Sequence, residues 1–291
     1  MTSLENDSDP AHALPNFVEL LRFRATTQSD TRGYTFLPDG EGTPATLTYG
    51  QLDERARAVA VLLEQHVEPG GRVLLCYPPG IDFIFGFFGC LYANRVAVPA
   101  YPPRPNRPMT ALEAIATHAQ VSAVLATQEI TGGRRARSAQ TPAFQGVRWL
   151  VTDSLEPSTA AAWTPREIPA DSIAALQFTS GSTMTPKGVI LSHRHLLCNT
   201  AVIENAFGGT RDSSIVIWLP PYHDMGLTGG ILQPLYSGVP VVLMAPSTFL
   251  RRPASWLRAI STYRAQYSGG PSFAYELCVG RSPATHAKIS I

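Results

Sequence analysis

The sequence predicts an α/β fold in which mostly parallel sheets are covered by helices. Short apolar runs alternate with helix-like segments along most of the 291 residues. Runs such as RVLLCY at 72–77 and VSAVLA at 121–126 lack the in-and-out alternation of a sheet with one wet face, as expected when helices cover both faces. With 44% hydrophobic and 15% charged residues, the chain has the composition of a globular protein with a large core.

The first residues predict a disordered segment followed by a helix. Residues 1–14 are polar and interrupted by proline, which is typical of an unstructured terminus. Phe17, Leu20, Leu21 and Arg24 then follow at the spacing i, i+3, i+4 and i+7. This spacing places them on one face of a short amphipathic helix.

A hairpin and a capped helix are predicted next. Residues 33–49 read as two strands around a turn rich in Asp and Gly, which is a hairpin pattern. Thr48 and Gln51 stand three residues apart, as the two partners of a capping box do. The helix that begins there ends near the breaker PGG at 69–71. Its buried face would consist of Leu52, Val59, Leu62 and Leu63.

The remaining elements alternate as in βαβ units. Parallel neighbours need a crossover between them, and helices supply it. The predicted strands are 72–77, 96–100, 121–126, 147–152, 173–178, 214–219, 239–245 and 266–268. The predicted helices are 81–93, 109–119, 192–207, 226–237 and 248–263.

Charge and cysteine usage exclude several classes of protein. Lys and Arg number 23 against 22 Asp and Glu, a net charge of +1, so we expect no nucleic-acid partner. The longest apolar stretch, 81–92, is shorter than the roughly 20 residues that span a bilayer, and it predicts a buried helix and no membrane span. Four dispersed cysteines without CxxC spacing predict free thiols and no zinc site. With no export signal, a cytoplasmic location is expected.

Residues 178–188, FTSGSTMTPKG, carry the clearest chemical signal. They leave a predicted strand and precede a predicted helix, where α/β sheets bind ligands. Hydroxyls, backbone N–H groups freed by Gly181 and the ammonium of Lys187 suit a polyphosphate. A plain Ser/Thr/Gly linker explains them less well, because the donors stand in register with a lysine. Pro186 and Gly188 replace the Gly and the Ser or Thr of a Walker P-loop, which disfavours that class of NTPase.

This loop resembles the phosphate-binding loop of the adenylate-forming superfamily, which includes acyl-CoA synthetases, nonribosomal peptide adenylation domains and luciferases. Met184, where most of that superfamily has glycine, and the preceding Leu176 and Gln177 resemble the fatty acyl-AMP ligase branch. Further stretches similar to that branch are AVPAYPP at 97–103, LPPYHDMGL at 219–227 and GGPSFAYEL at 269–277. The resemblance reads residues 15–280 as a partial AMP-binding domain, an incomplete N-terminal domain of that superfamily, and 281–291 as an atypical tail.

The resemblance implies a set of candidate site residues at the carboxyl ends of the strands. The catalytic candidates are Lys187 and His223. The nucleotide would contact Thr179, Ser180, Gly181, Ser182, Thr183 and Lys187. The acyl substrate would contact His223, Asp224, Met225, Gly226, Gly270 and Pro271. A histidine such as His223 would, without the motif, be read as a hydrogen-bonded core or capping residue. His193 and His195 are read as surface or capping residues, because no third metal ligand accompanies them.

The implied reaction is the activation of a long-chain fatty acid by ATP and Mg²⁺ as an acyl-adenylate. The acyl group would then pass to the phosphopantetheine thiol of an acyl carrier protein or of a polyketide or nonribosomal synthase module. Glycines and apolar residues of 226–237 would border the acyl tunnel, although core packing explains them as well. The family's magnesium-binding Glu, ribose-binding Asp and catalytic C-terminal Lys are not located in the chain, which predicts a truncated ligase. The alternative is a noncatalytic binding fragment or the remnant of a disrupted ligase gene.

Overall fold

The structure is a computed structural model that describes residues 9–40, 43–102, 109–132, 141–179, 186–210 and 212–281. The α-helices within this part are α1 (Phe17–Thr27), α2 (Tyr49–His66), α3 (Ile81–Tyr92), α4 (Thr110–Ala119), α6 (His193–Phe207), α7 (Asp224–Leu227), α8 (Gln233–Ser237), α9 (Pro246–Arg251), α10 (Ala254–Thr262) and α11 (Ser272–Arg281). The other helices are the 3-10 helices η1 (Pro10–Ala13), η2 (Pro142–Phe144) and η3 (Pro157–Ala162) and the π-helix η4 (Thr228–Leu232). The strands are β1 (Arg32–Leu37), β2 (Ala45–Thr48), β3 (Arg72–Cys76), β4 (Val96–Pro99), β5 (Ala123–Ala126), β6 (Arg148–Val151), β7 (Ile173–Thr179), β8 (Lys187–Ser192), β9 (Ile215–Ile217), β10 (Val241–Met244) and β11 (Tyr267–Ser268).

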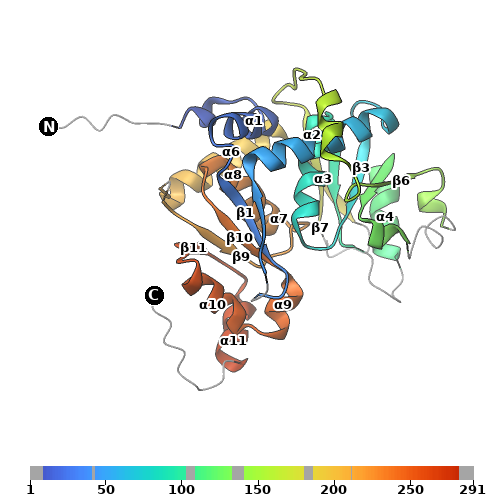
Figure 1. The fold of residues 1–291 in the computed structure, drawn as a ribbon. Helices are drawn as coiled ribbons and strands as arrows, with labels where there is room; N and C mark the ends of the chain where they lie inside the picture. Colours follow the sequence, from blue (N-terminus) through green and yellow to red (C-terminus); the bar gives the residue numbers. More distant parts are fainter. Residues whose placement is uncertain are drawn as a thin grey trace.

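Two sheets flanked by helices organise the chain (Figure 1). The five-stranded sheet has the strand order β11-β9-β10-β1-β2, and the six-stranded sheet has the order β6-β5-β3-β4-β7-β8. The edge strands β2 and β8 run antiparallel to their neighbours, whereas the other paired strands run parallel. The predicted α/β fold with mostly parallel sheets is confirmed.

Alternate residues of the strands face different helical layers, because successive side chains of a strand point to opposite faces. In β3, Val73 and Leu75 join a core cluster that both sheets share with α1, α2 and α3. Leu74 and Cys76 face the opposite way, toward α4 and η2. The outer face of the five-stranded sheet packs against α9, α10 and α11. The layers therefore run helix, sheet, helix, sheet, helix.

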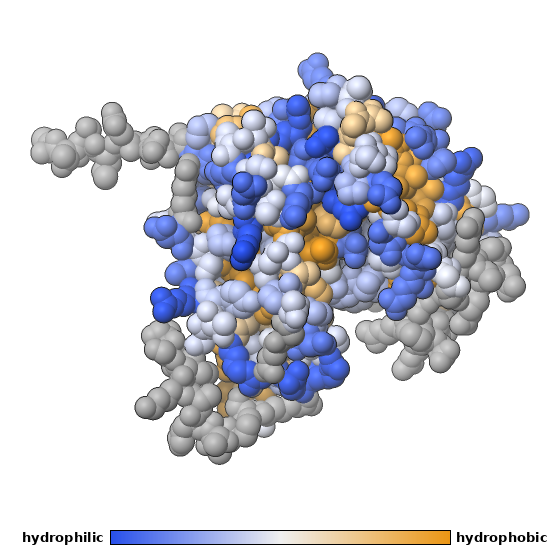
Figure 2. Space-filling view, viewed as in Figure 1, coloured by the Kyte–Doolittle hydropathy of each residue, from blue (hydrophilic) through white to orange (hydrophobic). Residues whose placement is uncertain are grey.

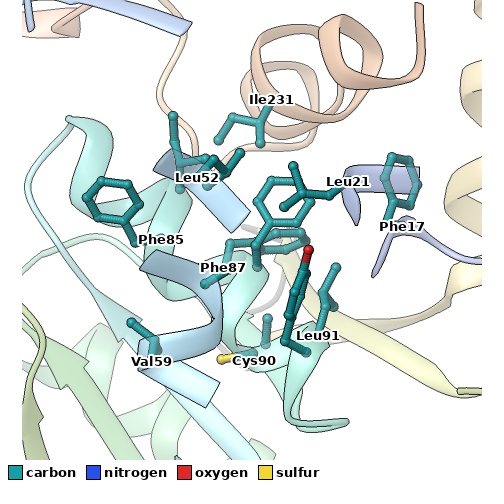
Figure 3. Packing of buried hydrophobic residues seen from close by; sticks show 14 of the residues in the cluster. Phe17, Leu21, Leu52, Val59, Phe85, Phe87, Cys90, Leu91 and Ile231 are labelled. Carbon is teal, nitrogen blue, oxygen red and sulfur yellow. The ribbon is translucent and has the colours of Figure 1, made fainter. Parts of the chain in front are cut away.

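The layer between the sheets combines α1, α2, α3 and the π-helix η4. Figure 3 shows apolar side chains from these elements meeting in one cluster, among them Phe17, Leu21, Leu52, Val59, Phe85, Phe87, Cys90, Leu91 and Ile231. Stretch 81–92 forms the helix α3, with ten of its twelve residues buried, so the predicted buried helix is confirmed. No helix in the described ranges is long and apolar enough to cross a membrane.

Two local predictions near the N-terminus have different outcomes. The capping box is confirmed: the Gln51 amide donates to Thr48 Oγ1 at 3.2 Å, and the Thr48 amide donates to Gln51 Oε1 at 3.0 Å. Residues 9–14 differ from the predicted disorder, because η1 forms there. Oδ2 of Asp9 forms a salt bridge with Nη2 of the buried Arg24 at 2.6 Å, and this contact holds η1 against α1.

The helical pattern of the C-terminal third is more divided than predicted. The predicted helix 248–263 consists of α9 and α10, because Pro253 disfavours helical geometry at the residue before it, where Arg252 has φ −139° and ψ 81°. The predicted helix 226–237 begins earlier, at Asp224, and continues through α7, η4 and α8. This continuous helix carries the candidate site at one end.

The surface of the molecule is mostly hydrophilic in the view of Figure 2, with apolar areas between the polar ones. Elsewhere in the described chain, Phe207 and Met225 are exposed apolar side chains, with 66% and 50% of their surface accessible. Both belong to the wall of the same cavity. Their exposure therefore marks an apolar entrance from solvent.

Candidate functional site

The predicted phosphate loop connects two antiparallel strands. Thr179 ends β7, Lys187 begins β8, and the two residues are paired in the register of the hairpin. Ser180, Gly181, Ser182 and Thr183 lie outside the described residues. The predicted strand-turn-helix arrangement is wrong at its third element, because β8 intervenes before α6 begins. Lys187 is exposed at the start of β8, so its ammonium is accessible to a ligand beside Thr179.

A tight turn after β9 presents His223 and Asp224. The His223 amide donates to the Pro220 carbonyl at 3.0 Å, and the Leu227 amide donates to the His223 carbonyl at 2.8 Å. Nδ1 of His223 contacts Oδ1 of Asp224, and both side chains are more than half exposed. That Asp224 oxygen also accepts from the Met225 amide at 2.7 Å. Asp224 therefore orients the imidazole and leaves its Nε2 atom turned away from this contact.

Gly226 is required by the close approach of this turn to the helix that follows. A Cβ atom at Gly226 would lie 2.0 Å from the Pro220 carbonyl oxygen and 2.9 Å from the Leu219 carbonyl oxygen. Real side chains do not approach a backbone so closely. The turn around His223 can pack as it does because this position has no side chain.

Gln177 joins the phosphate-loop hairpin to the histidine turn. Its Nε2 atom donates to the Tyr222 carbonyl oxygen at 2.9 Å, and Gln177 is 5% exposed. Its Oε1 atom is buried without a hydrogen-bond partner among the residues that the structure describes. The carboxyl end of β7 and the residue before His223 are thus held together, as predicted. The predicted reason, one shared sheet edge, is wrong, because β7 and β9 belong to different sheets. The hydrogen bond itself has no signal in the sequence.

The second predicted substrate segment follows β11. Gly270 packs against the indole of Trp218, since a Cβ atom at Gly270 would lie 3.2 Å from Trp218 Cζ2. The carbonyl of Pro271 accepts from the Ala274 amide at 2.9 Å and begins the first turn of α11. Gly269 lines the same cavity as Asp224 and Met225. The two predicted substrate segments therefore meet at one cavity.

This cavity has a volume of about 400 Å³ and lies between α6, the α7-η4-α8 helix and the five-stranded sheet. Its wall is formed by Asn199, Ile203, Glu204, Phe207, Gly209, Ser213, Ile215, Ile217, Leu219, Asp224, Met225, Thr228, Gly229, Gln233, Ser237, Val239, Tyr267, Ser268 and Gly269. Helix 226–237 contributes Thr228, Gly229, Gln233 and Ser237 to this wall, and its apolar residues Ile231, Leu232 and Leu235 pack in the core. Its role beside an acyl tunnel stays a prediction. The contribution of α6 was not predicted: the sequence predicts a helix at 192–207, but nothing in its residues indicates a cavity wall.

His193 and His195 have different environments although they are two residues apart. His195 caps α6 as predicted: its amide donates to Ser192 Oγ, and its Nδ1 accepts from the Ser192 amide, both at 3.2 Å. His193 is 1% exposed, so a surface position is wrong, and its capping contact is made to the first residue of α1. Its Nδ1 accepts from the Phe17 amide at 3.4 Å, and burial lowers the pKa of His193 to about 4.

A divalent cation has no ready site among these residues. Within the described ranges, no group of three or more His, Cys, Asp or Glu side chains is arranged to hold a metal ion. His223 and Asp224 form a pair and bond to each other. The magnesium predicted from the sequence therefore finds no ligand set in this part of the chain.

Comparison with known proteins gives one consistent family. Residues 22–289 match the profile of the AMP-binding enzyme family. The medium-chain-fatty-acid–[acyl-carrier-protein] ligase JamA of Moorena producens is 43% identical over 271 residues, which cover 92% of this chain and 46% of JamA. A long-chain-fatty-acid–AMP ligase of Mycolicibacterium smegmatis is 35% identical over 88% of this chain and 42% of its own length. The chain spans about half the length of the curated relatives it matches.

The solved structures agree with this result. The fatty acyl-adenylate ligase from L. pneumophila, solved in complex with acyl adenylate and pyrophosphate, superposes with a TM-score of 0.87 at 39% identity. The match covers 94% of this chain and 47% of that ligase. An adenylation structure complexed with phenylalanyl-adenylate has a TM-score of 0.80 at 22% identity, which shows a shared fold.

Proposed function

The chain belongs to the family of AMP-binding enzymes, and on this premise we propose that it serves the activation of a fatty acid as an acyl-adenylate. One carboxylate oxygen of the acid attacks the α-phosphorus of ATP, and the bond to the leaving pyrophosphate breaks. The observation that carries the proposal is the cavity whose wall includes Asp224, Met225 and Gly269. It offers an apolar chain a place next to the residues proposed to hold its carboxylate.

Burial of the acyl chain would supply most of the affinity for the acid. The cavity wall includes the apolar side chains Ile203, Ile215, Ile217, Leu219 and Val239. Each methylene removed from water contributes about 0.8 kcal/mol. Acids with longer chains should therefore bind better until the cavity is filled, and amino acids should bind poorly.

The phosphate-loop hairpin would hold the nucleotide. Thr179 and Lys187 are paired at the two ends of the loop, and Lys187 is the proposed catalytic cation. Its ammonium would offset the charge that grows on the departing pyrophosphate, a task of positioning and electrostatics. Ser180, Gly181, Ser182 and Thr183 remain proposed ligands of the phosphates.

His223 and Asp224 would position the reacting carboxylate. Asp224 accepts from Nδ1 of His223, which favours the tautomer in which the other ring nitrogen is an acceptor. When His223 is protonated, Nε2–H becomes a donor to a carboxylate or phosphate oxygen. Met225, Gly226, Gly270 and Pro271 keep their proposed role as the substrate wall. No step is assigned to magnesium, which remains an expectation for the complete reaction.

A thiol would complete the reaction in a second step. The sulfur of a phosphopantetheine group attacks the acyl carbonyl carbon, a thioester forms, and AMP leaves. Because one relative is named as an acyl-carrier-protein ligase, we propose a carrier protein, alone or within a polyketide or nonribosomal synthase, as the acceptor. The cytoplasmic location predicted from the sequence belongs to the same proposal.

Hydroxylamine capture tests the reaction. The chain would be continued with the part of JamA that lies outside the match and supplied with ATP, Mg²⁺ and either fatty acids or amino acids. We expect an acyl hydroxamate from fatty acids. Preferential activation of amino acids would contradict the proposal.

The variant Lys187→Ala tests the hairpin within this assay. Loss of one charge-assisted contact should lower the rate at subsaturating ATP about ten- to a hundredfold. Arg32→Ala is the matched control, because Arg32 is also an exposed cation at the first residue of a strand. Equal rates for the two variants would show that Lys187 does not contact the nucleotide.

A further inference from the structure

A cluster of three polar side chains interrupts the wall of the apolar cavity. Glu204 comes from α6, Gln233 and Ser237 come from α8, and all three line the cavity. Nε2 of Gln233 donates to Glu204 Oε2 at 3.0 Å and to Ser237 Oγ at 2.9 Å. The Ser237 hydroxyl donates to the same Glu204 oxygen. The three side chains thus form one closed network, called the polar cluster below.

The hydrogen-bond donors of the polar cluster are all bonded within the cluster, whereas some of its acceptors are not. An amide nitrogen has two hydrogens and a hydroxyl has one, and these three hydrogens have partners within the network. Gln233 is 6% exposed, and its Oε1 atom is buried without a hydrogen-bond partner in the described chain. The amide cannot be turned over without facing its oxygen to the Glu204 carboxylate. Because that oxygen is closed to solvent, Glu204 is the acceptor of the cluster that remains for a ligand at this wall, and a carboxylate accepts only from a donor group.

The negative charge of the Glu204 carboxylate also favours a donor group on the ligand. Among the described residues, no Lys, Arg or His side chain lies within salt-bridge distance of Glu204. Its carboxylate borders a cavity with mainly apolar walls, where weak solvent screening strengthens interactions with charge. A hydroxyl or an ammonium group would be attracted to this wall, and a second carboxylate would be repelled.

The position of the polar cluster along the cavity is set by the continuous helix α7-η4-α8. Asp224 begins this helix, and Gln233 and Ser237 follow nine and thirteen residues later. With a rise of about 1.5 Å per residue, they lie roughly 14 and 20 Å further along the helix. If the carboxyl end of the acid is near Asp224, the polar cluster faces the distal part of the acyl chain.

We propose that the acyl group selected by this cavity carries a hydrogen-bond donor, a hydroxyl or an ammonium, in its distal part, and that the polar cluster recognises it. This inference rests on the proposed function, because it assumes that the cavity holds the acyl chain. A plain alkyl end offers no hydrogen to the Glu204 carboxylate in the cavity wall. An acceptor-only end, such as a ketone or a carboxylate, cannot donate to it either.

Direct binding to the 291-residue chain tests the proposal without requiring turnover. Acids of increasing chain length would be compared in sets of equal length that end in a methyl, hydroxyl, ammonium or carboxylate group. Isothermal titration would give each dissociation constant. At the length that reaches the polar cluster, we expect the hydroxyl and ammonium acids to bind about tenfold tighter than the methyl acid, and the dicarboxylic acid to bind most weakly.

The variant Glu204→Gln separates recognition from a merely structural effect. It removes the charge and keeps an oxygen that can accept from Gln233 and Ser237. The advantage of the ammonium over the hydroxyl should shrink about tenfold, and the dicarboxylic acid should gain affinity. Glu129→Gln is the matched control, since Glu129 is exposed and is not part of the cavity wall. Thermal melting of both variants shows whether each is folded.

The outcomes distinguish this inference from the function on which it rests. If methyl-terminated acids bind as tightly as hydroxyl and ammonium acids at every length, the inference is overturned and the fatty-acid cavity stands. If none of the acids binds to the chain, the assignment of the cavity to an acyl group fails, and the inference fails with it. The comparison of ligands on the unaltered chain decides between these results even if Glu204→Gln does not fold.

Discussion

Replacing Gly226 with alanine should destabilise the chain and displace the turn that carries His223. A Cβ atom at this position would lie 2.0 Å from the carbonyl oxygen and 2.6 Å from the carbonyl carbon of Pro220, and 2.9 Å from the carbonyl oxygen of Leu219. All three atoms belong to the backbone and cannot rotate away as a side chain would. The new methyl group can be accommodated only if the turn and α7 move apart.

The size of the effect follows from two opposing contributions. Alanine is favoured over glycine inside a helix by about 1 kcal/mol, whereas overpacking costs about 1–3 kcal/mol and occasionally more. Because the overlap at Gly226 is with backbone, the overpacking cost should be at the upper end of that range, and subtracting the helix gain leaves a net loss of about 2 kcal/mol in the free energy of unfolding. Gly229 lies in the same helix with no atom within 4 Å of its added Cβ. Gly229→Ala should therefore stabilise the chain by up to about 1 kcal/mol.

Urea unfolding of the two variants, followed by circular dichroism, measures this difference. We expect the two free energies of unfolding to differ by about 2–3 kcal/mol, with melting temperatures that differ by about 2–4 °C for each kcal/mol. Because Gly229 lines the cavity, it serves as a control for stability and not for binding. If both substitutions stabilise the chain equally, the contact with Pro220 does not determine the geometry of the turn.

Three further predictions concern buried polar groups. Arg24→Ala should lower the free energy of unfolding in urea by about 3–5 kcal/mol. Arg24 is 1% exposed, and its loss would leave the carboxylate of Asp9 without its 2.6 Å partner. A loss below about 1 kcal/mol would contradict this prediction. Burial holds the pKa of His193 near 4 against an ordinary 6.5, so the unfolded chain gains the proton first, and stability should fall by about 3 kcal/mol as the pH drops from about 6.5 to 4. His193→Gln should remove most of this pH dependence of the free energy of unfolding, measured by urea titrations at several pH values. An unchanged pH dependence would show that other groups cause it. Gln177→Leu removes one hydrogen bond together with an oxygen that has no partner in the described chain. The melting temperature should therefore change little, while hydroxamate formation in the extended chain falls about tenfold. If stability and hydroxamate formation fall to the same extent, Gln177 has only a structural role.

Local patterns predicted the elements whose partners lie close in the sequence. The capping box of Thr48 and Gln51 needs only the four residues of one turn, and the structure contains it. Buried parallel strands such as 72–77 carry their signal in their own residues. The edge strand β8 was not predicted, because it exposes Val189 and Ile190 and, in the described part of the chain, pairs with β7 alone, so its sequence looks like the end of a loop.

Contacts between distant segments could not be predicted in this way. Strand β1 pairs with β10, about two hundred residues later, and no local pattern specifies that partner. His193 and His195 share the same local sequence, yet α1 covers His193 and leaves His195 to cap α6. The polar cluster is equally nonlocal, because Glu204 and Gln233 are brought together only when α6 packs against α8.

The helix that joins the two ends of the cavity is fixed by contacts outside the cavity. At its start, Gly226 packs against the backbone of Pro220. At its end, Arg24 donates to the carbonyls of Leu235 at 3.3 Å and Tyr236 at 2.8 Å. Both contacts are made between groups of the protein and do not need a ligand. The separation of the His223 turn from the polar cluster is therefore set before any ligand binds, and little ordering would be needed on binding. A preformed separation favours one distance between the carboxylate and the donor group of the acid. The advantage of a hydroxyl or ammonium acid over the methyl acid of equal length should therefore peak at one chain length, while the affinity of the methyl acids rises until the cavity is filled.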